Sequence, residues 1–133
     1  MEHREDVMDA IKEIKVKQIE FEEQCALFTY ADYMSNSVSE WGLLFAIPVG
    51  GLRNRATGAK LKRSGTKAGV PDMFLPVARG SYHGLFIELK SPKGTLQPNQ
   101  AQWLTSLSDQ GYKTTVCRSY ENARDTIENY LKS

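Results

Sequence analysis

Three polar residues lie at the two ends of one predicted β-hairpin. Asp72 follows a proline in the stretch GVPDMFLPVARGSYHGLFIELK, and Glu88 and Lys90 end its second predicted strand. Side chains alternate between the two faces of a strand, so Glu88 and Lys90 share one face while Leu85, Ile87 and Leu89 point into a core. The hairpin should bring Asp72 close to this pair. Two carboxylates beside an ammonium form a cluster that can hold a hard divalent cation and act on phosphates.

The elements that must position this cluster follow from hydrophobic spacing and from Gly and Pro punctuation. Helical spacing covers residues 6–17 and again 19–34, and no Gly or Pro decides between one helix and two. Pro98 suits a helix first turn, Gly111 a C-terminal cap and Ser119 an N-cap. The remaining expectations are a buried strand at 43–47, a short helix at 57–61, hairpin strands at 73–77 and 85–90, a helix at 98–110, a strand at 113–118 and a last helix at 120–131.

The element order α-β-β-β-α-β-α predicts an α/β fold with a mixed central sheet flanked by helices. At 133 residues the chain has the size of one domain, 1–133, with residues 1–18 as an N-terminal helical extension. Cys25 and Cys117 lack metal-ligand spacing and are expected to be reduced, packed thiols. The charged N-terminus and the absence of a long apolar run predict a cytosolic protein with no membrane partner.

A net charge of +1 says little about partners, but the charge is unevenly distributed. Residues 51–70 contain six basic residues and no acid, and this segment leads directly into Asp72. Such a segment favours contact with a phosphate backbone, although ordinary surface charge is an alternative explanation. The six predicted DNA contacts are Arg53, Arg55, Lys60, Lys62, Arg63 and Lys67.

The ordered set of motifs resembles one nuclease family. GVPD, a strand, GLFIELK, a helix opening QPNQAQWL and a Gly-Tyr strand together resemble the VRR-NUC family of the PD-(D/E)XK nuclease superfamily. The resemblance implies a restriction-endonuclease-like core and a metal-dependent nuclease. The family often has Asn where Val49 stands here, so a polar role at that position is in doubt.

The resemblance also assigns roles to residues. It implies that Mg²⁺ or Mn²⁺ is held by Asp72, Glu88 and the backbone carbonyl of Leu89, with Glu20 completing the metal shell directly or through water. It also implies that Lys90 orients the attacking water. Two further candidates lie on helices. Glu20 corresponds to the helix acid of the family, with Glu23 as the fallback in the same acidic run, and Gln100 lies near the cluster at the start of the following helix.

We therefore expect a structure-specific DNA endonuclease that acts on branched DNA such as Holliday junctions. Symmetric cutting needs two sites, which predicts a homodimer, and small members of the family are typical of bacteria or phage-infected cells. The alternatives are a nicking or restriction-type nuclease on linear duplex DNA, a non-catalytic DNA-binding module and, less well supported, a hydrolase of small phosphate compounds. Taken alone, Glu-x-Lys is more often a solvated edge pair and Pro-Asp a turn.

Overall fold

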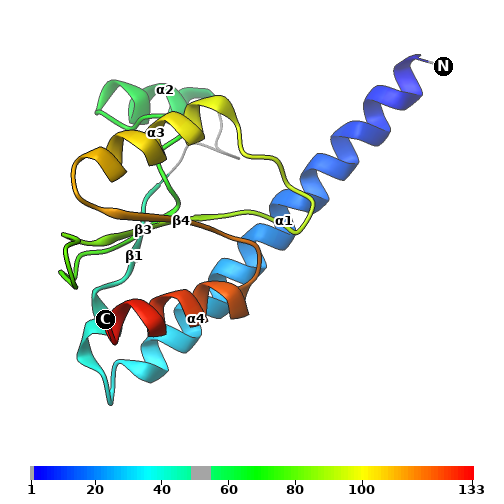
Figure 1. Ribbon diagram of the computed structural model, residues 1–133. Helices are drawn as coiled ribbons and strands as arrows, with labels where there is room; N and C mark the ends of the chain where they lie inside the picture. The colour runs from blue at the N-terminus through cyan, green and yellow to red at the C-terminus, as the bar shows by residue number, and fades with distance from the viewer. Residues whose placement is uncertain (1, 49–54) are drawn as a thin grey trace.

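The sheet at the centre of the molecule has helices on both of its faces (Figure 1). The computed structural model describes residues 2–48 and 55–133. Within them the elements are α1 (Glu2–Met34), the 3₁₀ helix η1 (Ser39–Leu43), β1 (Phe45–Ala46), α2 (Arg55–Arg63), β2 (Met73–Leu75), β3 (Leu85–Leu89), α3 (Pro98–Asp109), β4 (Lys113–Cys117) and α4 (Tyr120–Leu131). In this part of the chain, no helix is both long and apolar enough to cross a membrane.

The sheet is mixed, as predicted. Its strand order is β1-β2-β3-β4, with antiparallel pairing from β1 to β3 and parallel pairing of β3 with β4. The hairpin register places Met73 opposite Ile87, and the parallel register places Leu89 opposite Cys117. In Figure 1, α2 and α3 lie on one side of the sheet, while α4 and the C-terminal part of α1 lie on the other.

The main core forms between the sheet and the α1–α4 side. Leu85, Ile87 and Leu89 of β3 are buried, as predicted for its inward-facing residues, and Glu88 on the other face is buried as well. Burial of this apolar surface is the main source of the fold's stability. The core residues that meet here include Leu27 and Ala31 of α1, Leu85, Ile87 and Leu89 of β3, Cys117 of β4, and Ala123 and Ile127 of α4.

Residues 2–34 form one continuous helix, which decides the question left open by the sequence. Not all of its apolar residues reach the core, because Phe21 is 63% exposed and Cys25 is exposed. The helix packs on α4 only through its C-terminal part, where the fully buried residues are Leu27 and Ala31. Cys25 is therefore a free surface thiol rather than a packed one, whereas Cys117 is buried as expected.

The predicted buried strand at 43–47 is also wrong. The strand covers only Phe45–Ala46, and both residues are exposed because β1 is an edge strand that pairs with β2 alone. Within the predicted strand at 43–47, only Leu44 is buried in the core. The predicted short helix at 57–61 is present as the longer α2, and the predicted helices at 98–110 and 120–131 are confirmed as α3 and α4, with α3 ending one residue earlier. Ser119 caps α4 by accepting a hydrogen bond from the backbone N–H of Asn122.

Candidate active site

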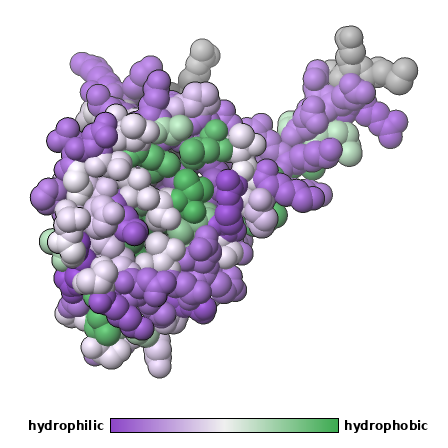
Figure 2. Space-filling model, in the orientation of Figure 1, coloured by the Kyte–Doolittle hydropathy of each residue, from purple (hydrophilic) through white to green (hydrophobic). Residues whose placement is uncertain are grey.

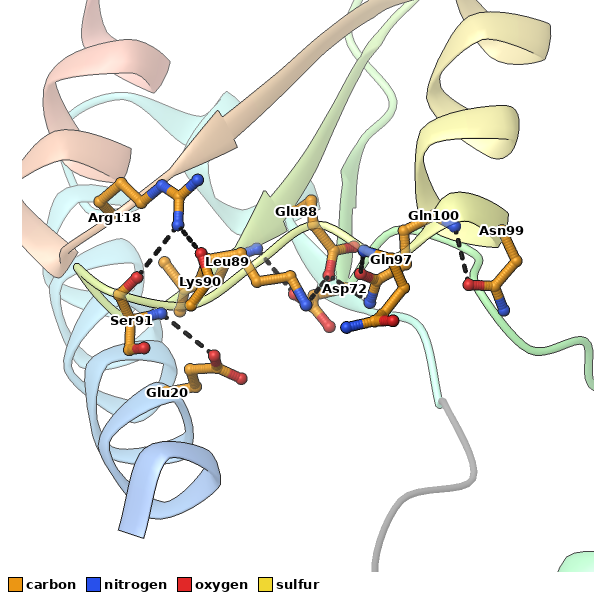
Figure 3. A network of polar contacts seen from close by, with 11 residues as sticks. Glu20, Asp72, Glu88, Leu89, Lys90, Ser91, Gln97, Asn99, Gln100 and Arg118 are labelled. Carbon is orange, nitrogen blue, oxygen red and sulfur yellow. Dashed lines mark hydrogen bonds and ion pairs between the residues drawn. The ribbon is translucent and has the colours of Figure 1, made fainter. Parts of the chain in front are cut away.

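The carboxylate of Asp72 is positioned by the first three strands. The carbonyl of Asp72 accepts a hydrogen bond from the backbone N–H of Ile47, which ties this residue to the β1 side. Its Oδ2 atom accepts a hydrogen bond of 2.7 Å from the backbone N–H of Leu89, at the end of β3 (Figure 3). A residue in extended conformation points its N–H and C=O to the same side, so the Leu89 carbonyl is expected on the Asp72 side of β3. The structure thus joins the beginning of β2 to the end of β3.

Glu88 lies at the centre of the site and is almost completely buried, with 2% of its surface exposed. Its Oε1 atom accepts a hydrogen bond of 3.1 Å from Gln100 and lies 3.8 Å from the Lys90 ammonium. Its Oε2 atom is buried and has no hydrogen-bond partner among the described residues. A buried carboxylate oxygen without a hydrogen-bond partner costs free energy. Because Glu88 is buried, it does not form a solvated edge pair with Lys90.

Gln100 reaches Glu88 because the first turn of α3 holds its side chain. Gln97 is the N-cap of this helix and Pro98 its first residue, as the sequence predicted for the proline. The Gln100 side chain accepts a hydrogen bond from the backbone N–H of Gln97 through Oε1 and donates to Glu88 through Nε2. This capping box fixes the orientation of the amide, so Gln100 presents a donor to the carboxylate.

The two acids of α1 have different partners. The Oε1 atom of Glu20 accepts a hydrogen bond of 3.1 Å from the backbone N–H of Ser91, just after Lys90. Glu23 instead accepts a hydrogen bond of 2.6 Å from the backbone N–H of Tyr120 and so caps the N-terminus of α4. Glu20 is therefore the better placed candidate. It stays apart from the other two acids, however, because within residues 2–48 and 55–133 no three His, Cys, Asp or Glu side chains converge as metal ligands.

Two residues that the sequence analysis did not identify hold Glu20 in place. The Arg118 guanidinium donates hydrogen bonds to the carbonyls of Ser91 and Gly94 and so closes the turn that follows β3. The Ser91 hydroxyl is buried and lacks a described partner. The position of Arg118 follows from the parallel register of β4 on β3. Cys117 pairs with Leu89, so Arg118, the next residue in the chain, lies beside the turn that follows β3.

The part of the basic segment in α2 lies on the same side of the sheet as α3 (Figure 1). Lys60, Lys62 and Arg63 are exposed on α2, and Lys67 is exposed in the turn after it. The indole N–H of Trp103 on α3 donates a hydrogen bond of 3.1 Å to the Ala68 carbonyl and ties this turn to the active-site helix. Three other predicted positions, Arg53, Val49 and the side chain of Arg55, lie outside the described residues.

Burial dominates the electrostatics of the two central acids. Burial, followed by the negative charge of Asp72, raises the pKa of Glu88 from its ordinary value of 4.5 to about 8, although the positive charge of Lys90 lowers it. Burial also raises the pKa of Asp72, against the hydrogen bond from Leu89, which lowers it. The charge of Glu20 raises the pKa of both groups. The raised pKa values mean that two negative charges are unfavourable in this site. A bound cation would offset that cost.

A pH dependence of stability follows for the metal-free protein. Between pH 4.5 and about 8, folded Glu88 retains a proton that the unfolded chain has released, so stability should fall as pH rises through this window. The slope can reach about 1.4 kcal/mol per pH unit for one group. We expect urea unfolding at pH 5, 6.5 and 8 to show a loss of stability for the wild type relative to Glu88→Gln. A wild type whose stability relative to Glu88→Gln stays constant or increases between pH 5 and 8 would contradict the assignment.

The donor set fits a hard divalent cation. Asp72 and Glu88 offer two carboxylates, Glu88 has a buried oxygen in need of a partner, and the Leu89 carbonyl adjoins them. Magnesium commonly binds through one or two carboxylates and keeps several waters, so a third acid in direct contact is not required. The charge of Glu20 raises the pKa of both acids, and its contact with the cation through a water molecule stays a prediction. Sulfur and imidazole ligands are missing from this described cluster, which disfavours zinc.

Comparisons with known proteins agree on one family. The profile of the VRR-NUC domain matches residues 24–121, a range that contains Asp72, Glu88, Lys90 and Gln100 but begins after Glu20. A solved structure named "VRR_NUC domain protein" is 29% identical, with a TM-score of 0.72 over 86% of this chain and 88% of its own. No curated protein matches the chain significantly.

Proposed function

Because this chain belongs to the VRR-NUC family of nuclease-type domains, we propose that it is a metal-dependent, structure-specific DNA endonuclease. It would hydrolyse phosphodiester bonds in branched DNA such as Holliday junctions, as a homodimer in the cytoplasm of a bacterium or phage-infected cell. The observation that carries the proposal is the buried Glu88 carboxylate, with one unpartnered oxygen, beside Asp72 and Lys90.

Each residue of the site has a role in this reaction. Asp72, Glu88 and the Leu89 carbonyl would hold Mg²⁺ or Mn²⁺. When bound, the cation supplies Lewis acidity toward a phosphoryl oxygen and lowers the pKa of a water molecule. Lys90 orients the attacking water and offsets the negative charge that develops on the phosphate. Gln100 fixes the Glu88 carboxylate through its hydrogen bond.

DNA would bind through its phosphates. The exposed basic side chains of α2 and of the turn after it form a positive surface. The hydrogen bond from Trp103 joins that surface to α3, the helix that carries Gln100. Phosphate contacts position a nucleic acid without reading its sequence. Recognition by branch geometry rather than by base edges is therefore the form of specificity that we propose.

Two alternatives make different predictions. A nuclease on linear duplex DNA would use the same site and differ only in substrate shape. A non-catalytic DNA-binding module gains nothing from the central acids, because two carboxylates near a phosphate backbone repel it and Glu88 carries a desolvation cost. The burial of Glu88 therefore favours an enzyme over a binding module.

A gel assay with labelled DNA tests the proposal. We expect the wild type to cut a four-way junction in Mg²⁺ or Mn²⁺ at least about tenfold faster than its linear duplex arms, and EDTA to stop the reaction. Equal cutting of both substrates would favour the linear-duplex nuclease. Binding without any cutting in either metal would contradict the enzyme.

A further inference from the structure

A pocket of about 410 Å³ lies between α3 and the turn that follows α2. None of the residues that line it belongs to α1, and Figure 2 shows the acidic N-terminal half of that helix standing clear of the globular part. The walls of the pocket combine an indole ring and aliphatic groups with a hydroxyl and an ammonium group. The residues that supply these groups are Ile47, Pro48, Val70 and Trp103, together with Thr66 and Lys67.

Trp103 forms an aromatic wall of this pocket in a fixed orientation. Its indole N–H donates the hydrogen bond to the Ala68 carbonyl, while the side chain as a whole is only half-buried. Trp41, in contrast, is 2% exposed and packs edge to face against Tyr30 in the core. Among the described residues no other ring packs against Trp103, so its indole is available to stack on a ligand.

A second wall is a rigid turn that carries positive charge. The backbone N–H of Thr66 donates to the Leu61 carbonyl at 2.9 Å, and the N–H of Gly65 donates to the Lys62 carbonyl at 3.2 Å. These two bonds form a Schellman motif at the end of α2, with Gly65 at a φ of 109°. Lys67 follows in the same turn and is exposed. An adjoining pocket of about 610 Å³ shares this turn and adds Lys62, so the basic surface continues along α2.

The pocket adjoins the active site through three short connections. Trp103 lies three residues after Gln100 on α3, and residues at this spacing are neighbours on a helix surface. The backbone N–H of Ile47 donates a hydrogen bond of 2.8 Å to the Asp72 carbonyl. Val70 precedes Asp72 by two residues. A group bound in the pocket and a phosphate at the active site can therefore belong to the same nucleotide or to neighbouring nucleotides.

We propose that this pocket binds one unpaired nucleobase of the DNA substrate, stacked on Trp103, with a neighbouring phosphate on Lys67. The inference rests on the proposed nuclease function and adds a contact to a base. Every nucleobase has a π face, so stacking requires no particular sequence. Withdrawing a base from a duplex costs free energy, and the cost is lowest when the base is already unpaired. The pocket therefore favours nucleotides at flaps, gaps and frayed branch points over intact duplex.

Binding measured in EDTA tests the contact without any cutting. Fluorescence anisotropy compares labelled single-stranded oligothymidine with an abasic strand of the same length, which carries the same phosphates and no bases. We expect the wild type to bind oligothymidine about tenfold more tightly than the abasic strand, and Trp103→Leu to bind both about equally. Equal affinity of the wild type for the two strands would overturn the inference.

A second variant separates stacking from the hydrogen bond to Ala68. Trp103→Phe keeps an aromatic ring and loses the indole N–H, so it should retain most of the preference for bases that Trp103→Leu loses. The matched control is Tyr33→Leu, which removes a 73% exposed ring from the C-terminal part of α1 and should bind as the wild type does. Equal losses in the Phe and Leu variants would mean that Trp103 only anchors the turn, and would overturn the stacking contact.

Tryptophan emission gives an independent measurement. Trp41 and Trp103 are the two tryptophans of the chain, and Trp41 is buried away from the pocket. Oligothymidine should quench the emission of the wild type and leave that of Trp103→Phe unchanged. A preference for bases without cleavage in Mg²⁺ or Mn²⁺ would support the pocket and contradict the nuclease. Cleavage without quenching or base preference would contradict the pocket alone.

Discussion

Replacing Glu88 by glutamine is expected to reduce metal-dependent DNA cleavage by about a thousandfold while the protein remains folded. The substitution removes one of the two anionic ligands proposed for the cation. It keeps the size of the side chain and leaves an amide oxygen that can still accept the hydrogen bond from Gln100. Single-turnover cleavage in Mg²⁺, compared with the wild type at the same enzyme concentration, measures the loss.

The control for this substitution is Glu121→Gln, which removes a carboxylate from the exposed first turn of α4. Its cleavage rate should equal that of the wild type. DNA binding by Glu88→Gln should be retained or tightened, because a negative charge near the phosphate is removed. Cleavage by Glu88→Gln within a few-fold of the wild type would show that the buried carboxylate has no catalytic role.

Replacing Lys90 by methionine is expected to reduce cleavage by about a hundredfold. The Lys90 ammonium lies 3.8 Å from Glu88, with 11% of its side chain exposed, so it is a partly enclosed charge beside the proposed metal position. Methionine retains most of the apolar stem and removes the cation that would orient water and offset charge on the phosphate. The rate should fall even at saturating DNA, because the contribution of Lys90 increases in the transition state.

The effect of Lys90→Met on metal binding separates catalysis from metal retention. Loss of a neighbouring positive charge should leave Mn²⁺ affinity unchanged or higher in calorimetry. The matched control is Lys93→Met, in the exposed turn after β3, which should preserve the rate. A loss of Mn²⁺ binding in Lys90→Met would mean that this lysine holds the acids in place rather than assisting the reaction.

The local geometry of the site was predictable because it depends on short-range rules. The alternation of β3 and the hairpin with β2 place Glu88, Lys90 and Asp72 together, and both are encoded within about twenty residues. The helix-start signal at Pro98 was also correct, whereas Gln100 was placed near the cluster by the family resemblance. The sequence did not reveal that Gln100 also closes its own capping box, which depends on side-chain rotamers rather than on spacing.

The features that were missed depend on contacts between distant segments. Leu27 rather than Phe21 enters the core because α4 contacts only the C-terminal part of α1, and helical periodicity cannot tell which stripe finds a partner. The run at 43–47 is apolar, yet its strand is exposed because it lies at an edge of the sheet. Arg118 is separated by 27 residues from the Ser91 carbonyl that it binds, so its role required the strand order.

The most direct measurement is a crystal structure of the wild type soaked in Mn²⁺, with anomalous differences to locate the ion. The account predicts a peak bounded by the carboxylates of Asp72 and Glu88 and by the Leu89 carbonyl, with Oε2 of Glu88 among the ligands. The same soak of Glu88→Gln should show a weaker peak or none. A wild-type crystal with no peak at this position, or with the ion bound only elsewhere, would contradict the proposed metal site.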